Sequence, residues 1–381
     1  MNSSQELGIY IHWPFCEKKC PYCDFNSHVQ GNIDHLEWLK AYLNELRYYA
    51  NETSDRVIKS VFFGGGTPSL MKTIIIEKIL DEIQILWNLS KNVEITAEAN
   101  PSSSESQLFK DFNLAGINRL SIGVQSFNNQ SLKFLGRLHN ADQAKNAITI
   151  ARKIFPRFSF DLIYALPNQS AATWKKELLA AANIAGEHIS LYQLTIEPGT
   201  EFYKKRITAA NQIVGYDLYK LTQEIMDKAA LPAYEISNHA KKGQESVHNL
   251  NYWQGGDYLG IGPGAHGRIT KANKTEMMHN YRDPERWLNL ASTKNTGGQK
   301  RSKLSNEERH DELVLMGLRL IKGISLDYYN SLTGKHLINI LDQKKINFLI
   351  NRGFLKLNKG FLKATIEGRQ RLNAVLSYLL T

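Results

Sequence analysis

The sequence predicts an α/β protein whose larger part is a partial (β/α)6 barrel of the TIM type, followed by a small C-terminal helical domain. Short apolar runs with strand character alternate with segments of helical periodicity over about the first 200 residues. This alternation is typical of a parallel sheet, whose strands need helical crossover connections. Polar or glycine-rich residues follow nearly every expected strand, at the edge where barrels of this type build their sites.

Six strands are expected, each beginning a β/α unit. They cover residues 7–12, 57–63, 93–97, 119–123, 159–164 and 189–194. The helices that connect them are expected at residues 35–50, 73–86, 104–114, 140–154 and 172–185. Six units are fewer than the eight of a closed TIM barrel, so the barrel is expected to be incomplete.

The pattern changes after residue 235. Residues 239–267 are rich in glycine and histidine and have little periodicity. Helical patterning returns with expected helices at 307–321 and 338–351, and a hairpin is expected at 354–361 around Asn358-Lys359-Gly360. Helices followed by a small hairpin resemble a winged-helix module. The predicted division is therefore a barrel domain (1–235), a connecting or capping segment (236–303) and a C-terminal helical, winged-helix-like domain (304–381).

Composition narrows the class of protein. Apolar residues make up 42% of the chain, but no run approaches the about 18 apolar residues of a membrane span, and the N-terminus lacks the pattern of a secretory signal. A cytoplasmic location is expected. The formal net charge is +10, and about seven of these charges follow residue 300. This excess permits an anionic partner, although a solvated basic surface explains it equally well.

All three cysteines of the chain lie in one short segment, as Cys16-x-x-x-Cys20-x-x-Cys23. A redox-active pair or buried filler residues are alternatives, but three thiols at this spacing favour a metal site. Structural zinc is usually held by four ligands. An iron–sulfur cube is usually held by four thiolates, so a cube held by three would keep one iron free for another ligand.

A glycine-rich segment, Gly64-Gly65-Gly66-Thr67-Pro68, follows the second expected strand. Without Cβ atoms, its backbone can approach a ligand closely. The segment matches neither a Walker loop nor a dinucleotide-binding turn, and an ordinary turn between strand and helix is the alternative.

Four further polar residues are candidates for the same site: Glu98 and Gln125 follow expected strands, Asp161 lies on the fifth, and Arg137 lies between the fourth and the fifth. A ligand with an amino acid end and a ribose needs a carboxylate, a cation and hydroxyl acceptors, which these side chains supply. Any one of them alone is better explained as a surface or supporting residue, and Arg137 in particular could simply be solvated.

Taken together, these motifs resemble those of radical S-adenosylmethionine (SAM) proteins. The resemblance is closest to the oxygen-independent coproporphyrinogen III oxidase group and, within it, to the HemW-type haem chaperones. It covers nearly the whole chain. The segments that carry it are 10–16 with Cys20, Tyr22 and Cys23, then 64–69, Glu98, 123–127, Arg137, 160–163 and 312–319.

The resemblance implies a set of cofactor contacts. Cys16, Cys20 and Cys23 would hold a [4Fe–4S] cluster whose open iron binds the methionine end of SAM. One electron passed to the sulfonium would yield methionine and a 5′-deoxyadenosyl radical, although productive cleavage is left open and no residue is assigned a catalytic role. The implied SAM contacts are Gly65, Gly66 and Thr67 near the methionine end, Glu98, Gln125, Arg137 and Asp161 around the remainder, and Tyr10 and Tyr22 flanking cluster and cofactor.

Two features distinguish the oxidases of this group from the chaperones. The oxidases typically have a further cysteine two residues after the third and a longer N-terminal extension, whereas this chain reads Cys23-Asp24-Phe25 and has about nine residues before Tyr10. The segment 246–253 matches the H-N-x-x-Y-W signature of the chaperone branch. Imidazole can ligate haem iron, and aromatic rings can pack on a macrocycle. The expected haem-binding residues are His248, Asn249, Tyr252 and Trp253.

Alternatives to His248 remain open. A histidine beside aromatic residues can simply form hydrogen bonds in a packed loop, and His239 or His266 could ligate iron instead. The glycine-rich residues 260–267 are expected to close the barrel site.

The resemblance thus implies a haem chaperone that delivers haem to respiratory or membrane proteins, working in the cytoplasm or at the inner face of the membrane. An electron donor for the cluster is an expected partner, and homodimer formation is left open. The alternative is the oxidase that decarboxylates coproporphyrinogen III to protoporphyrinogen IX. Nucleic-acid binding is disfavoured because the C-terminal module lacks a base-reading pattern.

Overall fold

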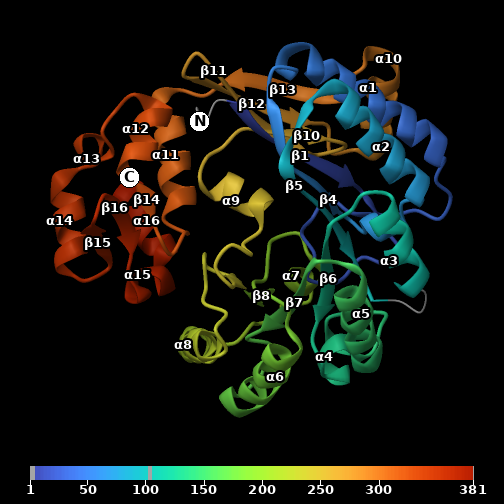
Figure 1. Cartoon of the computed structure of the whole chain (residues 1–381). Coiled ribbons are helices and arrows are strands. Elements are labelled where there is room, and N and C mark those ends of the chain that lie inside the picture. Colours follow the sequence, from blue (N-terminus) through green and yellow to red (C-terminus); the bar gives the residue numbers. More distant parts are fainter. Residues whose placement is uncertain (1–4, 102–104, 381) are drawn as a thin grey trace.

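Six parallel strands form the centre of the fold in the computed structural model, which describes residues 5–101 and 105–380. They lie side by side in chain order and in parallel register (Figure 1). The six expected β/α units are therefore confirmed. The strands are β1 (Glu6–Trp13), β4 (Val57–Gly65), β5 (Asn88–Ala99), β6 (Arg119–Gln125), β7 (Arg157–Tyr164) and β8 (His188–Gln193).

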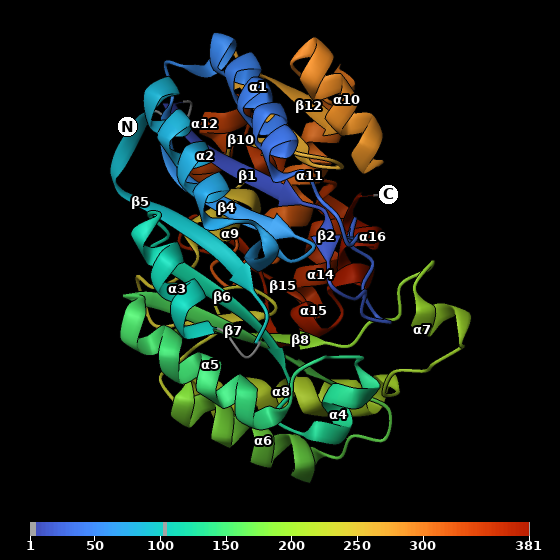
Figure 2. The same ribbon diagram turned by 90° about the vertical axis from the view of Figure 1, so that its right-hand side faces the viewer.

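Helices cover the outer face of this sheet, as Figure 2 shows. Several begin at a polar residue whose side chain accepts backbone N–H bonds, including Asp34, Asn140 and Ser170. The main covering helices are α1 (His35–Thr53), α2 (Thr73–Leu86), α3 (Glu105–Leu114), α5 (Ala141–Ile154), α6 (Ala171–Ile184) and α8 (Gln212–Lys228). The shorter elements are η2 (Pro68–Leu70), α4 (Asn129–Phe134) and α7 (Glu201–Lys204). Residue 104, where the third helix was expected to begin, lies outside the described residues.

The sheet extends beyond the six strands at both edges. β9 (Asn238–Ala240) pairs antiparallel with β8, and β10 (Tyr258–Ile261) pairs parallel with β1. An antiparallel series then continues from β10. Its strands are β11 (His266–Lys271), β12 (Lys274–Asn280) and β13 (Gly298–Lys303). None of these strands is expected from the sequence pattern. The result is an open eleven-stranded sheet with β9 and β13 at its edges.

Residues 236–303 also contain two helices, α9 (Val247–Trp253) and α10 (Pro284–Lys294). Leu259, Ile269 and Trp287 are fully buried in the same apolar core as the barrel strands. This part of the chain is therefore continuous with the barrel, beyond the connecting role expected for it.

The C-terminal domain has an apolar core of its own, which includes Val314, Leu362 and Val375. The expected hairpin is confirmed as β15 and β16, whereas the single helix expected at 338–351 is two helices. Asp342 separates them because its side chain caps the second one. The elements are α11 (Asn306–Gly317), β14 (Ile324–Ser325), α12 (Leu326–Thr333), α13 (Leu337–Ile340), α14 (Gln343–Asn351), β15 (Leu355–Asn358), β16 (Phe361–Ala364), α15 (Ile366–Gln370) and α16 (Leu372–Leu380).

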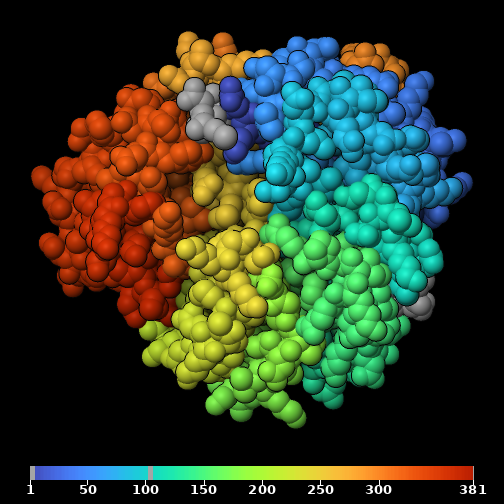
Figure 3. Space-filling model, viewed as in Figure 1, coloured from blue at the N-terminus to red at the C-terminus, as the bar shows by residue number. Residues whose placement is uncertain are grey.

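The C-terminal domain packs against the barrel beside α9, as the ribbon and the space-filling view both show (Figures 1 and 3). Arg268 on β11 forms an ion pair with Glu312 on α11 at 3.1 Å. Arg309, also on α11, donates to the carbonyl oxygen of Gly255 at 2.5 Å. Across both domains, no described helix has the length and apolar character needed to cross a bilayer.

Candidate functional site

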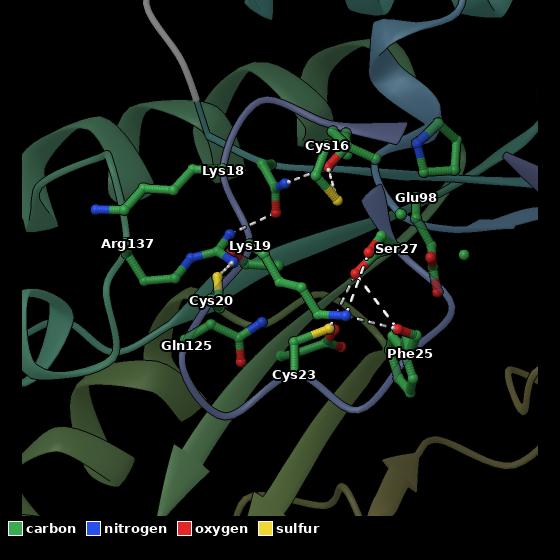
Figure 4. Close-up of a pocket in the computed structure, with 18 of the residues that line it drawn as sticks. Cys16, Lys18, Lys19, Cys20, Cys23, Phe25, Ser27, Glu98, Gln125 and Arg137 are labelled. Atoms are coloured by element: carbon green, nitrogen blue, oxygen red, sulfur yellow. Dashed lines mark hydrogen bonds between the residues drawn. The ribbon is translucent and has the colours of Figure 1, made fainter. Parts of the chain in front are cut away.

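The three cysteines lie on the loop that follows β1. The loop is bounded by a short parallel pair of strands, β2 (Phe15–Cys16) and β3 (His28–Val29). All three thiols are free and half-buried, and they line one cavity (Figure 4). No three His, Cys, Asp or Glu side chains of residues 5–101 and 105–380 are close enough to hold a single metal ion.

Polar groups from neighbouring elements contact each sulfur atom. Arg137 Nη1 donates to Cys20 Sγ at 3.3 Å, and Thr67 Oγ1 donates to Cys16 Sγ at 3.3 Å. The third thiol, on Cys23, lies 3.6 Å from the hydroxyl of Ser27. Hydrogen bonds of this kind stabilise thiolates. At Cys16, burial nevertheless raises the pKa of the thiol, and the hydrogen bond from Thr67 only partly offsets this. All three thiols face the cavity (Figure 4).

Arg137 connects the thiol loop to two barrel strands. Besides Cys20, its guanidinium donates to the Asn100 side chain and, at 2.8 Å, to the carbonyl oxygen of Gly123. Its Nε is buried without a hydrogen-bond partner among the described residues. The guanidinium therefore fixes the loop relative to the sheet and lines the cavity.

The glycine segment at the end of β4 packs closely against β1 and the thiol loop. The backbone N–H of Gly66 donates to the carbonyl oxygen of Trp13 at 2.7 Å, and that of Thr67 donates to Phe15 at 2.8 Å. A Cβ atom on Gly66 would lie 2.7 Å from the Phe15 oxygen, and one on Gly65 would lie 2.7 Å from the His12 ring. These glycines line the thiol cavity. Because a Cβ atom at either position would clash, glycine is also needed for this segment to pack against β1 and the thiol loop.

Two carboxyl groups lie on the cavity wall, Glu98 at the end of β5 and Asp161 on β7. Burial, together with the negative charge of Asp161, raises the pKa of Glu98 to about 8. Burial also raises the pKa of Asp161 to about 6. Both values fall when a cation binds between or beside the two groups. The wall therefore suits a positively charged ligand.

Gln125 supplies an acceptor that no described residue uses. Its backbone has a φ of 71°, and its side-chain Oε1 is buried without a hydrogen-bond partner among the described residues. Buried polar atoms are rarely left unpaired. This acceptor lines the same cavity as the thiols and Arg137. The donor set fits a cluster held by three thiolates beside a cationic, hydroxyl-bearing ligand.

Of the two expected tyrosines, one lines the thiol cavity and one does not. Tyr22 is in the loop and faces the cavity. Tyr10 instead hydrogen-bonds to Nδ1 of His12 at 3.0 Å and lines a neighbouring cavity. The other expected SAM contacts all line the thiol cavity, namely Gly65, Gly66, Thr67, Glu98, Gln125, Arg137 and Asp161.

The neighbouring cavity, of about 740 Å³, lies between the barrel and α11. It shares Phe25, Gly65 and Glu98 with the thiol cavity, so the two spaces are adjacent. Its volume is typical of a small-molecule site. The remaining wall is largely aromatic and imidazole, with Tyr252, Trp253, Tyr258, His266 and His279.

The four residues of the signature on α9 face two different spaces. Trp253 lines the larger cavity, His248 and Asn249 line a smaller one of about 200 Å³, and Tyr252 lines both. His248 is buried, and burial lowers its pKa to about 3. Its Nδ1 is hydrogen-bonded to Ser60 at 2.8 Å and its Nε2 to Tyr252 at 2.7 Å. Neither ring nitrogen is free to bind iron unless one of these bonds breaks.

The two alternative histidines, His239 and His266, differ in their hydrogen bonds and in whether they line the larger cavity. His239 is buried on β9 and hydrogen-bonds to the Leu231 carbonyl group at 3.2 Å. His266 lines the larger cavity.

Two further residues at the site are not expected from the sequence. The side chain of Asn100 accepts a hydrogen bond from Arg137, and Lys19 donates to the carbonyl oxygens of Phe25 and Ser27. Asn100 follows the third strand directly, which is the signal that could have identified it.

Comparison with known proteins places these features in context. The profile of the Radical SAM superfamily matches residues 10–181, and that of the HemN C-terminal domain matches residues 304–371. The chain is 36% identical to "Heme chaperone HemW" of Haemophilus influenzae, over 98% of both chains. It is 34% identical to "Radical S-adenosyl methionine domain-containing protein 1, mitochondrial" of Danio rerio, over 98% of this chain and 87% of that one.

A solved structure shares the fold. Coproporphyrinogen III oxidase (HemN) from Escherichia coli, described as a radical SAM enzyme, superimposes with a TM-score of 0.84 at 20% identity. The match covers 99% of this chain and 90% of the oxidase. At this identity the comparison shows a common architecture, including the C-terminal domain.

Proposed function

The chain belongs to the radical SAM superfamily and, within it, to the HemW group, and we propose that it is a haem chaperone. In this proposal it binds a [4Fe–4S] cluster, SAM and haem, and it passes haem to respiratory or other membrane proteins. The observation that carries the proposal is the cavity of about 740 Å³ beside the thiol cavity, lined by Tyr252 and Trp253 of the signature. The full-length similarity to curated haem chaperones supports it.

We propose that Cys16, Cys20 and Cys23 hold the cluster. When bound, such a cluster offers one iron that has no protein ligand. Arg137 and Thr67 would stabilise the thiolates of Cys20 and Cys16 through the hydrogen bonds that they donate to the sulfur atoms. A hydrogen bond donated to sulfur favours the charged form of the ligand.

For SAM we propose the wall formed by the glycine segment, the two carboxyl groups and Gln125. The close backbone of Gly65, Gly66 and Thr67 leaves room for the methionine end. Glu98 and Asp161 supply negative charge opposite a cationic ligand, Gln125 offers its free acceptor, and Arg137 can bind a carboxylate. Tyr22 would flank the cluster, and Tyr10 would lie further away, at the neighbouring cavity.

Haem would lie in the larger cavity, against the rings of Tyr252 and Trp253. Asn249 and His248 belong to the same signature and are proposed to support this site from the smaller cavity behind it. The backbone N–H of His248 donates to the buried Glu94 at 3.0 Å, and Phe62 stacks on its ring at 5.1 Å. These contacts would hold α9, and with it the two cavity-facing rings, in place.

A paired experiment tests the proposal. Cluster-loaded protein is titrated anaerobically with haem, and the Soret band is followed by difference spectroscopy against the protein alone. In parallel, the protein is incubated with coproporphyrinogen III, SAM and a reductant. Stoichiometric haem binding without vinyl products is expected. Formation of protoporphyrinogen IX would overturn the chaperone proposal, and so would failure to bind haem.

The second candidate is the oxygen-independent coproporphyrinogen III oxidase, which the common fold favours. Against it, Asp24 and Phe25 stand where the oxidases typically have a further cysteine soon after the third thiol. The chaperone proposal also implies an electron donor for the cluster, a cytoplasmic location and contact with the inner face of the membrane during transfer. Co-sedimentation with vesicles that contain a haem-free respiratory acceptor tests the last point.

A further inference from the structure

The larger cavity contains three imidazoles, and only two of them are free to bind a metal. His12 donates through Nε2 to the Asn26 carbonyl oxygen at 2.9 Å and accepts the Tyr10 hydroxyl at Nδ1. His266 and His279 line the same cavity. Within the described part of the chain, neither of these two rings has a hydrogen-bond partner.

His266 and His279 form a stacked cross-strand pair. They stand directly opposite each other on the antiparallel strands β11 and β12. Their rings stack with centroids 4.2 Å apart and planes inclined by 25°. Because cross-strand partners are fixed by the sheet register, both imidazoles are presented together at one wall. Either one can move towards a ligand while the other supports it.

The surroundings keep both rings neutral. Burial, the neighbouring His279 and the positive charges of Arg268 and Arg282 lower the pKa of His266 to about 4. Burial and Arg282 lower the pKa of His279 as well. The neutral imidazole is the form that binds iron.

The rest of the wall suits a flat ligand with an anionic edge. Tyr252 and Trp253 offer ring faces, and Met316 adds an apolar thioether. The side chain of Arg282 lines the cavity and has no ion-pair partner among the residues described. A carboxylate at the edge of the ligand would satisfy this charge. Glu312 also lines the cavity, but Arg268 already neutralises it at 3.1 Å.

The histidine of the signature is less available. Binding of iron by His248 would break its hydrogen bond to Ser60 or to Tyr252, both of which are largely buried. The group left behind would lose its partner, which is unfavourable for a buried polar atom. His266 and His279 carry no such cost.

We propose that the His266–His279 pair provides the axial nitrogen ligand to the iron of a haem bound in the larger cavity, with Arg282 facing a propionate. This assignment rests on the proposed haem-binding function. His248 then acts as a positioning residue that orients Tyr252. Since both rings of the pair lie at the same wall, only one of them binds the iron, and the other can replace it.

The test compares single and double variants of the full-length, cluster-loaded protein. The H266A/H279A variant is expected to raise the Kd for haem by about tenfold or more and to lose the Soret and EPR signature of nitrogen ligation. Each single variant is expected to retain that signature. The H248A variant should also retain it, with weakened binding. Added imidazole should restore the wild-type spectrum of the double variant, which a merely structural defect would not allow.

Three outcomes are distinct. A wild-type ligation signature in the double variant, together with its loss in H248A, would overturn the assignment and leave His248 as the ligand. Failure of imidazole to restore the spectrum would also count against the pair. Failure of the wild-type protein to bind haem at all would instead overturn the proposed function. Circular dichroism and the thermal midpoint confirm that each variant is folded.

Discussion

The Nε2 atom of His248 lies 2.7 Å from the hydroxyl oxygen of Tyr252, one turn further along α9. Its other ring nitrogen is bonded to Ser60 on β4. The imidazole thus connects the helix to a barrel strand and at the same time fixes the tyrosine whose ring lines the larger cavity. The signature histidine therefore has a clear structural role that is independent of metal binding.

Removing only the hydroxyl of Tyr252 tests this relationship. We expect Tyr252→Phe to lower the free energy of unfolding by about 1–3 kcal/mol, because the buried Nε2 of His248 loses its partner. Tyr258→Phe is the matched control, since Tyr258 packs edge-on against Tyr252 and makes no side-chain hydrogen bond to the described residues. Urea denaturation followed by far-UV circular dichroism measures both. Equal losses in the two variants would contradict the role assigned to the bond.

The raised pKa of Glu98 predicts a pH-dependent affinity for SAM. In the free site this pKa is about 8, so the group is mostly protonated at pH 7. A cationic ligand favours the carboxylate, and binding below pH 8 therefore releases a proton. We expect the affinity to rise between pH 6 and 8, by up to about tenfold per pH unit.

Calorimetry of cluster-loaded protein in two buffers of different ionisation enthalpy measures this proton release. Glu98→Gln is the control, because the amide keeps the size of the side chain and cannot titrate. It should bind SAM more weakly and lose the rise between pH 7 and 8, where Asp161, with a pKa of about 6, is already ionised. A flat affinity in the wild-type protein, with no proton exchanged, would show that Glu98 does not face the ligand.

Substitution of Glu45 on α1 is expected to lower the free energy of unfolding strongly. One of its carboxyl oxygens accepts from the backbone of Gly262 at 2.9 Å and from the indole of Trp287 at 3.0 Å. The other accepts from the backbone of Gly297 at 2.8 Å. In Glu45→Gln an amide NH₂ would face N–H donors, so we expect a loss of about 3 kcal/mol. Chemical denaturation measures it, and the exposed Glu37→Gln on the same helix should change little.

Gly136 supports the thiol loop by contact. Its φ is +69°, and a Cβ atom there would lie 2.6 Å from Cδ of Pro21, which directly follows Cys20. We expect Gly136→Ala to displace the loop and to speed the loss of iron to a chelator. Gly334→Ala is the matched control, because Gly334 has a φ of +68° and nothing within 4 Å of its Cβ position.

Both alanine variants strain the same left-handed backbone, which costs about 1–2 kcal/mol each. Only the variant at Gly136 should also change iron retention, measured by the absorbance of the cluster after addition of chelator. Equal retention in the two proteins would mean that the contact with Pro21 does not hold the loop.

The barrel could be predicted from the sequence because its parallel strands are apolar and regularly separated by helices. Glu98 and Gln125 meet at one cavity because the carboxyl ends of parallel strands lie at one edge, and Asp161 joins them from within β7. That geometry follows from topology alone. The same logic could have selected Asn100, which ends the same segment as Glu98.

The antiparallel extension could not be predicted, for two physical reasons. β13 is polar along its whole length, with the sequence Gly-Gln-Lys-Arg-Ser-Lys, because it forms an edge of the sheet. β10 is only four residues long and contains Gly260, where a Cβ atom would collide with the backbone of His266. His279 was therefore not expected near His266, since their proximity depends on a strand pairing that leaves no pattern in the sequence.

The wall between the two cavities has a thermodynamic consequence. Gly65 and Glu98 line both spaces, so ligands that filled the two cavities together would meet at one carboxyl group. A cation bound in the thiol cavity would keep Glu98 ionised, so a ligand in the larger cavity would face a negative charge. Each ligand would then change the affinity of the other by the same factor, in either order of binding. Binding of the cofactor and binding of the cargo would be thermodynamically linked, with the shared carboxyl group as one point of coupling.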